Sequence, residues 1–288
     1  MKKIRIGYIL GGYKGLKFFK KFNQSYDIAF VGYTFDKIQY DEKVGDEFYK
    51  LFTGYNLIDL KTDKLPEADL IFVVGYNRII KEIKPNMIVF HDSRLPKYRG
   101  WSPTVSQLIN NESYLGVSAF FPTKGFDEGN IIKTRITTIH YPIKIRLAYD
   151  LVIKMYSDVA NEIIKEYNDT GFIPSTTQTG DPSYCLWRDE RDYRIDWKSS
   201  AEEIKRFVDA LGYPYQGALT FLEGLLVKVN EVQVIKGIDL EYGQPGKVFN
   251  NKNNQPVVVC GSGMVKLLDY ESISGKKNFL SRLRVRFE

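Results

Sequence analysis

The stretch MIVFHDSRLPKYRG, residues 87–100, decides the fold of the first part of this chain. Its four leading residues, 87–90, are all apolar, which is typical of a strand buried on both faces of a parallel sheet. The polar residues 92–94 then form the loop at the carboxyl end of that strand, where ligands bind in open α/β sheets. This pattern predicts a functional position for His91, although a histidine there can also merely hydrogen-bond a neighbouring turn.

Apolar runs and amphipathic segments alternate on either side of this stretch, which favours an α/β domain with a largely parallel sheet. Strands are expected over residues 4–10, 28–33, 57–60, 70–76, 115–122 and 130–139. Helices are expected over residues 16–22, 104–110 and 142–167, with residues 36–51 helical or irregular. Ser102 is predicted to cap the helix over 104–110, with Pro103 in its first position.

A glycine-bearing turn is expected after the first strand. Gly11, Gly12 and Gly15 form GGxxG, which differs from the GxGxxG dinucleotide fingerprint, and no acidic residue ends the second strand, so we do not predict NAD. Such a turn can hold a phosphate or approach a ligand closely with its backbone, or it can be a plain tight turn.

The last third of the chain has a different character. Residues 168–182 are rich in Gly, Pro, Ser and Thr and are predicted to be an interdomain linker. A helix over 200–210 and short strands over 218–221, 225–234, 246–248, 256–260 and 264–270 then indicate a small antiparallel barrel. We therefore expect two domains, residues 1–178 and residues 179–288.

Composition narrows the class of protein. The net charge of +6 is compatible with an anionic partner such as nucleic acid, a nucleotide or a folate tail, and it does not choose among them. The lysines of residues 14–21 are read as a solvated helix face rather than a polyanion site. No apolar run approaches the roughly 20 residues of a membrane span, and we expect a cytoplasmic protein. Cys185 and Cys260 lie far apart, which indicates neither a disulfide framework nor a zinc site.

The motifs of both halves resemble one family, the N10-formyltetrahydrofolate-dependent formyltransferases. Its signature is N-x-H-x-S-L-L-P followed by R-G, with an aspartate followed by x-G some thirty residues later. The matching residues here are His91, Ser93, Leu95, Pro96, Arg99, Gly100, Asp127 and Gly129. Five segments are similar to the domain shared by methionyl-tRNA formyltransferases and the sugar-nucleotide formyltransferase of the lipid A arabinose pathway: residues 193–197, 200–204, 213–218, 244–248 and 259–263. The resemblance implies an α/β, Rossmann-like parallel-sheet formyltransferase domain followed by a small OB-like antiparallel β-barrel domain.

The resemblance also implies a reaction and the residues that perform it. A formyl group moves from N10-formyltetrahydrofolate to a primary amine without a metal, with His91 as general base and acid and Asp127 as its carboxylate partner. The folate-contacting residues that it implies are Arg78, Ile79, Ile80, Ser93, Arg94, Leu95, Pro96, Thr123, Lys124, Gly125 and Phe126. The residues expected to contact the amine substrate are Gly11, Gly12, Tyr13, Lys14, Arg99 and Trp101.

Two positions depart from the family pattern. Val89 stands where the family has an asparagine that helps to hold the formyl oxygen, and we hypothesise that Asn77, at the end of the adjacent strand, replaces it. The alternative is that Asn77 only forms a strand-end turn. Trp101 stands where the arabinose-pathway enzyme has a substrate-binding arginine, and its ring could stack on a sugar or base or merely pack the loop.

The acceptor of the formyl group is predicted from the absence of two sequence features of the tRNA enzymes. The tRNA enzymes usually open with a strand followed by G-T-P-D-F-A and carry a basic insertion, whereas residues 10–16 here read LGGYKGL and residues 39–47 are mixed in charge. We therefore expect a nucleotide-linked amino sugar, with dTDP-4-amino-4,6-dideoxyglucose as the best candidate. The 3-amino isomers, UDP carriers and a homodimer stay open.

The same family relation suggests a role in lipopolysaccharide O-antigen biosynthesis, with neither a membrane nor a nucleic acid as partner. Two alternatives remain: a methionyl-tRNA formyltransferase, and a non-catalytic nucleotide- or RNA-binding protein on the same scaffold.

Overall fold

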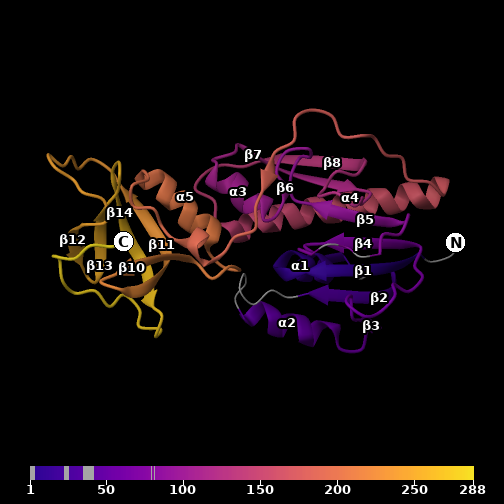
Figure 1. Ribbon diagram of the computed structural model, residues 1–288, viewed down its shortest axis with the longest axis horizontal. Helices are drawn as coiled ribbons and strands as arrows, with labels where there is room; N and C mark the ends of the chain where they lie inside the picture. Colours follow the sequence, from indigo (N-terminus) through magenta and orange to yellow (C-terminus); the bar gives the residue numbers. More distant parts are fainter. Residues whose placement is uncertain (1–3, 23–25, 35–41, 79, 81) are drawn as a thin grey trace. The chain divides into compact units, whose positions relative to one another are not determined.

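A computed structural model describes residues 4–22, 26–34, 42–78, 80 and 82–288 of the chain (Figure 1). Ile79, and residues 36–41 of the segment expected to be helical or irregular, lie outside the described residues. The chain forms two compact units. The first unit consists of Met1–Gln107, Ser113–Ile139 and Leu147–Trp187. The second unit consists of Leu108–Glu112, His140–Arg146 and Arg188–Glu288. The first unit thus runs past residue 178, and the domain boundary expected there stays a prediction. Among the described residues, no helix combines the length and the apolar character that a bilayer span requires.

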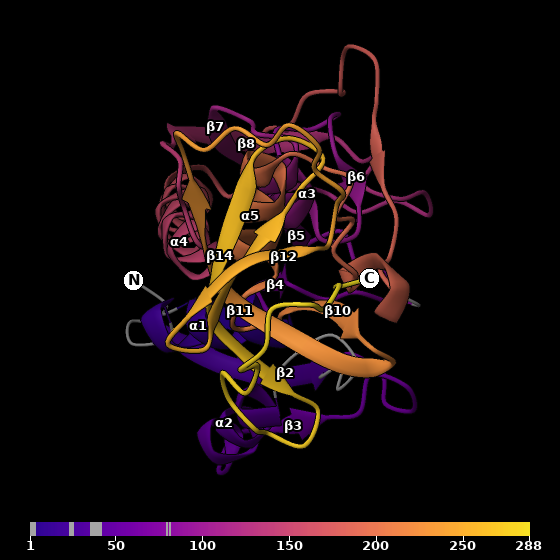
Figure 2. The same ribbon diagram turned by 90° about the vertical axis from the view of Figure 1, so that its left-hand side faces the viewer.

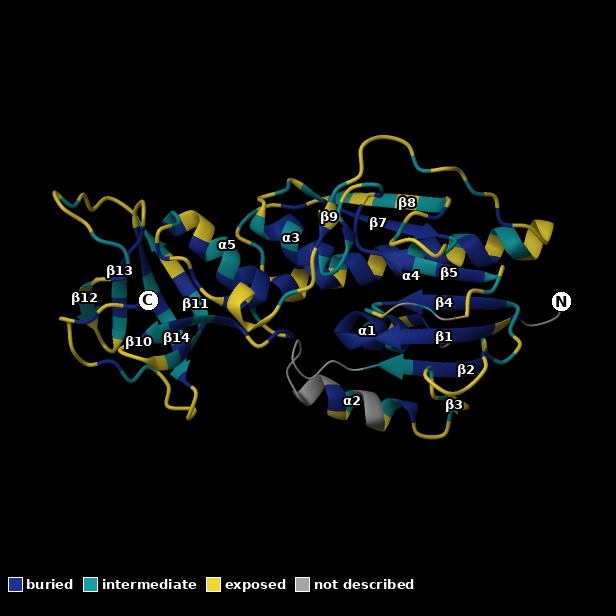
Figure 3. Cartoon of the chain, in the orientation of Figure 1, coloured by how far each residue is buried: buried dark blue, intermediate teal, exposed yellow. Residues whose placement is uncertain are grey.

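A seven-stranded sheet forms the centre of the first unit, in the order β3-β2-β1-β4-β5-β7-β8. The strands are β1 Arg5–Gly11, β2 Asp27–Thr34, β3 Leu57–Ile58, β4 Leu70–Val74, β5 Met87–His91, β7 Tyr114–Phe120 and β8 Ile131–Thr138. β1 to β5 are parallel, whereas β7 runs antiparallel to β5 and β8 antiparallel to β7. The predicted Rossmann-like sheet is confirmed. Its central strands are mostly buried (Figure 3), as their continuous apolar sequences require.

Four helices accompany this sheet among the described residues, α1 Gly12–Phe22, α2 Glu42–Phe52, α3 Pro103–Ile109 and α4 Ile145–Thr170. Phe18 of α1 and Tyr156 of α4 both pack on Phe90 of β5, with ring centroids 5.7 and 5.5 Å from that of Phe90. This aromatic cluster buries the strand that ends in His91 and so fixes where its loop begins.

The glycine stretch after β1 differs from the expectation. α1 begins directly at Gly12, so the expected turn over residues 11–15 is largely the first turn of the helix. A Cβ atom on Gly11 would collide with the carbonyl oxygen of Gly75, and one on Gly75 would collide with the carbonyl oxygen of Gly11. These glycines therefore permit two backbones to approach closely at the carboxyl ends of β1 and β4.

Residues 168–182, expected to be an interdomain linker, are partly packed against the sheet. Thr176 exchanges two main-chain hydrogen bonds with Ile131, and β9 Tyr184–Cys185 pairs in parallel with β6 Arg99–Gly100. We call residues 176–185 the strap. The linker prediction is wrong for residues 176–182, because they belong to the first unit and are hydrogen-bonded to its loops after β5 and β7.

The second unit contains the 3-10 helix η2 Glu190–Tyr193, helix α5 Ala201–Leu211 and a five-stranded antiparallel sheet (Figure 2). The sheet order is β10-β11-β14-β13-β12, with bounds Ala218–Leu222, Leu225–Ile235, Met264–Ser272, Gln255–Val259 and Val248–Lys252. The C-terminal residues 285–288 hydrogen-bond to both β10 and β12, through Phe221 N to Glu288 O (2.9 Å) and Val248 N to Val285 O (3.2 Å). The two edges of the sheet are thereby joined, as the predicted small barrel requires.

Candidate active site

A cavity of about 510 Å³ opens at the carboxyl ends of β4 and β5. Its walls come from the β4–β5 connection, the end of β5 and the loops that follow β6 and β7. The lining residues include Val73, Asn77, Arg78, Ile80, Val89, Phe90, His91, Trp101, Phe120, Thr123, Lys124, Gly125, Phe126 and Asp127. This is the edge at which the sequence predicted chemistry.

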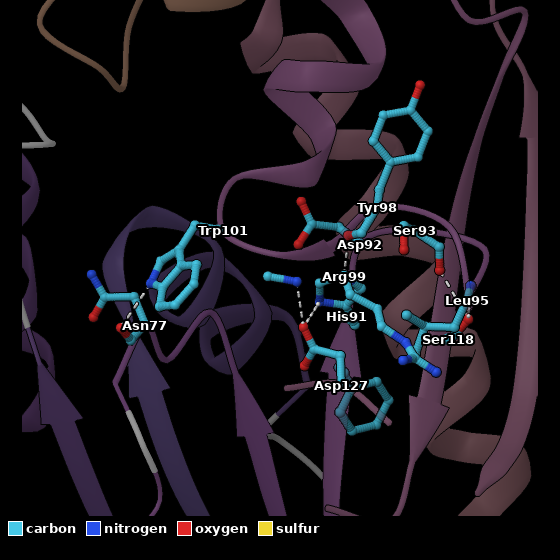
Figure 4. Close-up of polar contacts among 12 residues, drawn as sticks. Asn77, His91, Asp92, Ser93, Leu95, Tyr98, Arg99, Trp101, Ser118 and Asp127 are labelled. Atoms are coloured by element: carbon cyan, nitrogen blue, oxygen red, sulfur yellow. Dashed lines mark hydrogen bonds and ion pairs between the residues drawn. The ribbon is translucent and has the colours of Figure 1, made fainter. Parts of the chain in front are cut away.

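His91 uses one ring nitrogen for structure and presents the other to Asp127. Its Nε2 lies 2.7 Å from the main-chain oxygen of Tyr98 (Figure 4). A carbonyl oxygen can only accept, so Nε2 must carry a proton, and in the neutral imidazole Nδ1 is then the acceptor. Nδ1 lies 3.5 Å from Asp127 Oδ2. The turn contact is therefore present at Nε2, and the functional role of His91, for which Nδ1 is the atom left, stays a prediction.

Asp127 reaches the histidine from the loop between β7 and β8. Its φ of +52° lies in the left-handed region, and Oδ2 accepts a 2.7 Å hydrogen bond from Gly100 N. The 3.5 Å separation from His91 Nδ1 is too long for a normal hydrogen bond. The pair thus leaves space for one reacting atom to contact both groups, which suits an amine nitrogen.

Asp92, the residue after the histidine, is buried at 3% exposure and connects several elements. Its carboxylate accepts from Lys14 Nζ, from the hydroxyl of Thr104, from Thr104 N (3.2 Å) and from the Tyr156 hydroxyl (3.3 Å). Asp92 thus satisfies an N–H in the first turn of α3, the role that the sequence suggested for Ser102. Lys14, expected to contact substrate, borders the cavity while its ammonium is committed to Asp92.

The environment of Asp92 predicts a stability effect. Burial alone would raise its pKa, but the Lys14 charge, the His91 charge and the hydrogen bonds from Lys14 and Thr104 outweigh burial and lower the pKa to about 2. A carboxyl whose folded pKa is depressed stabilises the fold above its unfolded pKa and loses this contribution as pH falls through the folded value. We expect Asp92→Asn to destabilise the protein by about 3 kcal/mol at pH 7. The difference from wild type should shrink by about 2 kcal/mol between pH 5 and pH 2.

Urea unfolding at several pH values measures this difference. Asp46→Asn, at an exposed position in α2, is the matched control. A destabilisation by Asp92→Asn that is the same at pH 2 and pH 5 would contradict the assignment.

The residues expected to contact folate divide into two groups. Arg78, Ile80 and the loop residues Thr123, Lys124, Gly125 and Phe126 border the cavity. Ser93, Arg94, Leu95 and Pro96 are not among its lining residues. The Ser93 hydroxyl donates to Lys97 O (2.6 Å), and Leu95 N donates to the Ser118 hydroxyl (3.1 Å), so these residues shape the loop. Ile79 lies outside the described residues.

The residues expected to contact the amine substrate are also only partly at the cavity. Trp101 and Lys14 border it, whereas Gly11, Gly12, Tyr13 and Arg99 are not among its lining residues. Tyr13 is buried and stacks on Tyr149 with ring centroids 6.1 Å apart. The Trp101 ring lies 5.2 Å from that of Phe126, which gives one wall of the cavity an aromatic pair.

Val89 and Asn77 both border the cavity, and Val89 presents apolar surface where the family pattern has an amide. Trp101 Nε1 donates to the main-chain oxygen of Asn77 (3.2 Å), and the Asn77 carboxamide points away from His91 and Asp127 (Figure 4). The role of Asn77 in holding the formyl oxygen therefore stays a prediction, and it requires the side chain to rotate.

We expect Asn77→Ala to lower kcat about tenfold. Removal of a hydrogen-bond donor that already points at the developing oxyanion costs ~100-fold in kcat, and the effect here is smaller because the Asn77 amide must first turn toward the site. The measurement is kcat for release of tetrahydrofolate from N10-formyltetrahydrofolate in the presence of an amine acceptor. Unchanged turnover would show that Asn77 is only a strand-end residue.

Gln178 and several backbone groups at the site were missed by sequence reasoning. Gln178 Nε2 donates to the main-chain oxygens of Asp127 (2.7 Å) and Gly129 (2.8 Å). Gln178 sits in a polar segment typical of a linker, and the Tyr98 carbonyl and Gly100 N–H belong to every peptide unit, so no residue pattern marks them. Within the described part of the chain, no three His, Cys, Asp or Glu side chains form a group that could hold a metal ion.

Comparisons with known proteins agree on one family. The model described as "Formyl transferase" matches residues 60–142, and "Formyl transferase, C-terminal domain" matches residues 189–281. The methionyl-tRNA formyltransferase of Alkaliphilus oremlandii is 30% identical over 218 residues, which are 73% of this chain and 68% of that protein. The methionyl-tRNA formyltransferase of Caldanaerobacter subterraneus is 27% identical over 214 residues, which are 73% of this chain and 68% of that protein. The chain thus spans about two thirds of the length of these relatives, and it spans 64% of the methionyl-tRNA formyltransferase of Streptococcus sanguinis.

Solved structures show the same fold. The N-formyltransferase from Helicobacter canadensis, in complex with folinic acid and dTDP-3-aminofucose, gives a TM-score of 0.62 at 18% identity over 92% of this chain and 98% of that one. HypX from Aquifex aeolicus in complex with tetrahydrofolic acid gives a TM-score of 0.66 at 15% identity, over 94% of this chain and 45% of that one. The chain therefore spans less than half of HypX.

Proposed function

This chain belongs to the formyl transferase family, and from that premise we propose that it transfers the formyl group of N10-formyltetrahydrofolate to the amine of a nucleotide-linked amino-dideoxy sugar. The observation that carries the proposal is the meeting of His91, from the end of β5, and Asp127, from the β7–β8 loop, in one cavity. We propose that the reaction takes place in the cytoplasm.

The geometry of the pair supports specific roles for the two residues. The neutral amine attacks the formyl carbon while His91 Nδ1 takes one of its protons, because Nε2–H is already donated to Tyr98 O. The imidazolium that forms is stabilised by the Asp127 carboxylate. When the tetrahedral intermediate collapses, the bond from the formyl carbon to N10 breaks, and the proton passes from His91 to N10. The products are the formamide and tetrahydrofolate, and the imidazole is neutral again.

The cavity supports folate as the formyl donor. Its apolar wall, made by Val73, Val89, Phe90 and Phe120, suits a flat heteroaromatic ring. The adjoining segment of residues 123–127 offers main-chain groups that can pair with the edge of such a ring. Arg78 and Lys124 border the same cavity and can neutralise the carboxylates of a folate tail.

The aromatic wall supports a sugar nucleotide as acceptor. Trp101 and Phe126 present faces that can stack on a sugar or a base, and the sequence lacks the arginine-rich insertion of the tRNA enzymes. Our best candidate is dTDP-4-amino-4,6-dideoxyglucose, whose formylated product would serve O-antigen synthesis. The second candidate is charged initiator tRNA, because curated relatives at 26–30% identity are methionyl-tRNA formyltransferases.

One assay separates these functions. The protein is incubated with N10-formyltetrahydrofolate and, in turn, dTDP-4-amino sugar, dTDP-3-amino sugar, UDP-4-amino-arabinose and charged initiator tRNA. Tetrahydrofolate release and product mass are measured. Formylation of a dTDP-amino sugar supports the proposal, and formylation of the tRNA alone contradicts it. No reaction with any acceptor would favour a non-catalytic binder on the same scaffold.

A further inference from the structure

The strap contacts the loop that follows β5, the strand that ends at His91, and the β7–β8 loop that carries Asp127. Gln178 uses its whole carboxamide there: Nε2 donates to the carbonyls of Asp127 and Gly129, and Oε1 accepts from Arg99 Nη2 (2.8 Å). A side-chain amide has two N–H donors and one carbonyl acceptor. This residue is therefore a clamp on the loop between β7 and β8.

The β7–β8 loop contains a backbone conformation that other contacts must stabilise. Asp127 has a φ of +52°, and a residue with a side chain keeps such a conformation only where its surroundings hold it. The two carbonyls that Gln178 contacts belong to Asp127 itself and to the residue two places further on. Without these bonds the loop can relax, and the Asp127 carboxylate can leave its place 3.5 Å from His91 Nδ1.

The other end of the strap acts on the opposite side of the histidine ring. Ser183 Oγ accepts from Tyr98 N (2.9 Å), and Ser183 O accepts from Arg99 N (2.8 Å). Tyr98 also has a positive φ, +58°, and its carbonyl is the group that receives His91 Nε2–H. The strap therefore supports the partner of each ring nitrogen, Tyr98 at Nε2 and Asp127 at Nδ1.

We propose that the strap belongs to the catalytic machinery, with Gln178 and Ser183 as positioning residues that hold Asp127 and Tyr98 on the two sides of His91. Neither touches the reacting atoms, and both act through the residues that they hold. Arg99 fastens the strap through its side chain to Gln178 and through its main chain to Ser183. The inference rests on the proposed roles of His91 and Asp127.

Three variants of the 288-residue chain test it. Gln178→Met keeps the length of the side chain and removes all three hydrogen bonds. Gln178→Glu keeps an acceptor for Arg99 and replaces the donor with an oxygen that faces two carbonyls. Ser183→Ala removes only the bond to Tyr98 N. Gln233→Met, at an exposed position in β11, is the matched control.

Two measurements are made on each variant. The first is kcat and KM for formyl transfer. We expect kcat to fall about tenfold for both Gln178 variants and severalfold for Ser183→Ala, with KM for both substrates within twofold of wild type. The second measurement is NMR of the imidazole ¹⁵N resonances of the histidines at fixed pH. The chain has only two histidines, His91 and His140, so His140 is an internal reference. We expect the His91 resonances to shift and those of His140 to stay unchanged.

The results separate this inference from the proposed function. Unchanged kcat and unchanged His91 resonances in Gln178→Met and Ser183→Ala would overturn it. A loss of activity accompanied by shifted His140 resonances would also overturn it, because the strap would then act on general stability. If wild type transfers formyl to no acceptor, the proposed function fails, and the His91 resonances still decide whether the strap sets the ring environment. If Gln178→Met does not fold, Gln178→Glu and Ser183→Ala decide it in the same way.

Discussion

Replacement of His91 by glutamine is expected to lower kcat for formyl transfer about 1,000-fold while the protein stays folded. Glutamine can still donate from its amide nitrogen to the Tyr98 carbonyl, the contact that His91 Nε2 makes at 2.7 Å. It has no basic nitrogen to take a proton from the amine. The loss therefore measures proton transfer rather than the turn contact.

The measurement is the rate of tetrahydrofolate release at saturating donor and acceptor, with circular dichroism to check the fold. His140→Gln is the matched control, because His140 is exposed and is the other histidine in the chain. A His91→Gln variant that keeps a tenth or more of wild-type turnover would leave His91 with a structural role alone.

Replacement of Asp127 by asparagine is expected to lower kcat about 100-fold with little change in KM. The amide oxygen can still accept from Gly100 N, the 2.7 Å bond that anchors the side chain. The negative charge is lost, however, and with it the stabilisation of the imidazolium that forms as His91 takes the proton. The loss should therefore appear in the chemical step and not in substrate binding.

Single-turnover rates with enzyme in excess test this, because they isolate the transfer from product release. Asp150→Asn, at an exposed position in α4, supplies the control for a lost surface charge. If Asp127→Asn raised KM in proportion and left kcat unchanged, Asp127 would be a substrate-binding residue.

Part of the site could be predicted because it is encoded locally. The apolar run of residues 87–90 requires a buried strand, and the polar residues after it require a loop, so His91 had to lie at the carboxyl edge of the sheet. The loop that carries Asp127 was likewise expected between two strands, whereas the role of Asp127 itself came from the family resemblance. A pattern of this kind depends only on neighbours along the chain.

Lys14 shows where local reasoning ends. Its place in a glycine-bearing turn suggested substrate binding, yet its ammonium pairs with Asp92, 78 positions along the chain. Burial of Asp92 makes a cationic partner necessary, and only the packing of α1 against β5 determines which cation is near enough.

The sequence by itself determined the two kinds of domain, the strand that delivers His91 and the loop that delivers Asp127, because hydrophobic periodicity and turn chemistry act over a few residues. The tertiary structure alone decided that the strap packs on both loops, that Gln178 holds Asp127, and that the Tyr98 carbonyl and Gly100 N–H orient the reacting pair. The physical reason is that these contacts join distant segments through a carboxamide and through peptide groups. Such groups pair with whatever the fold brings near, and the order of the residues does not reveal that partner.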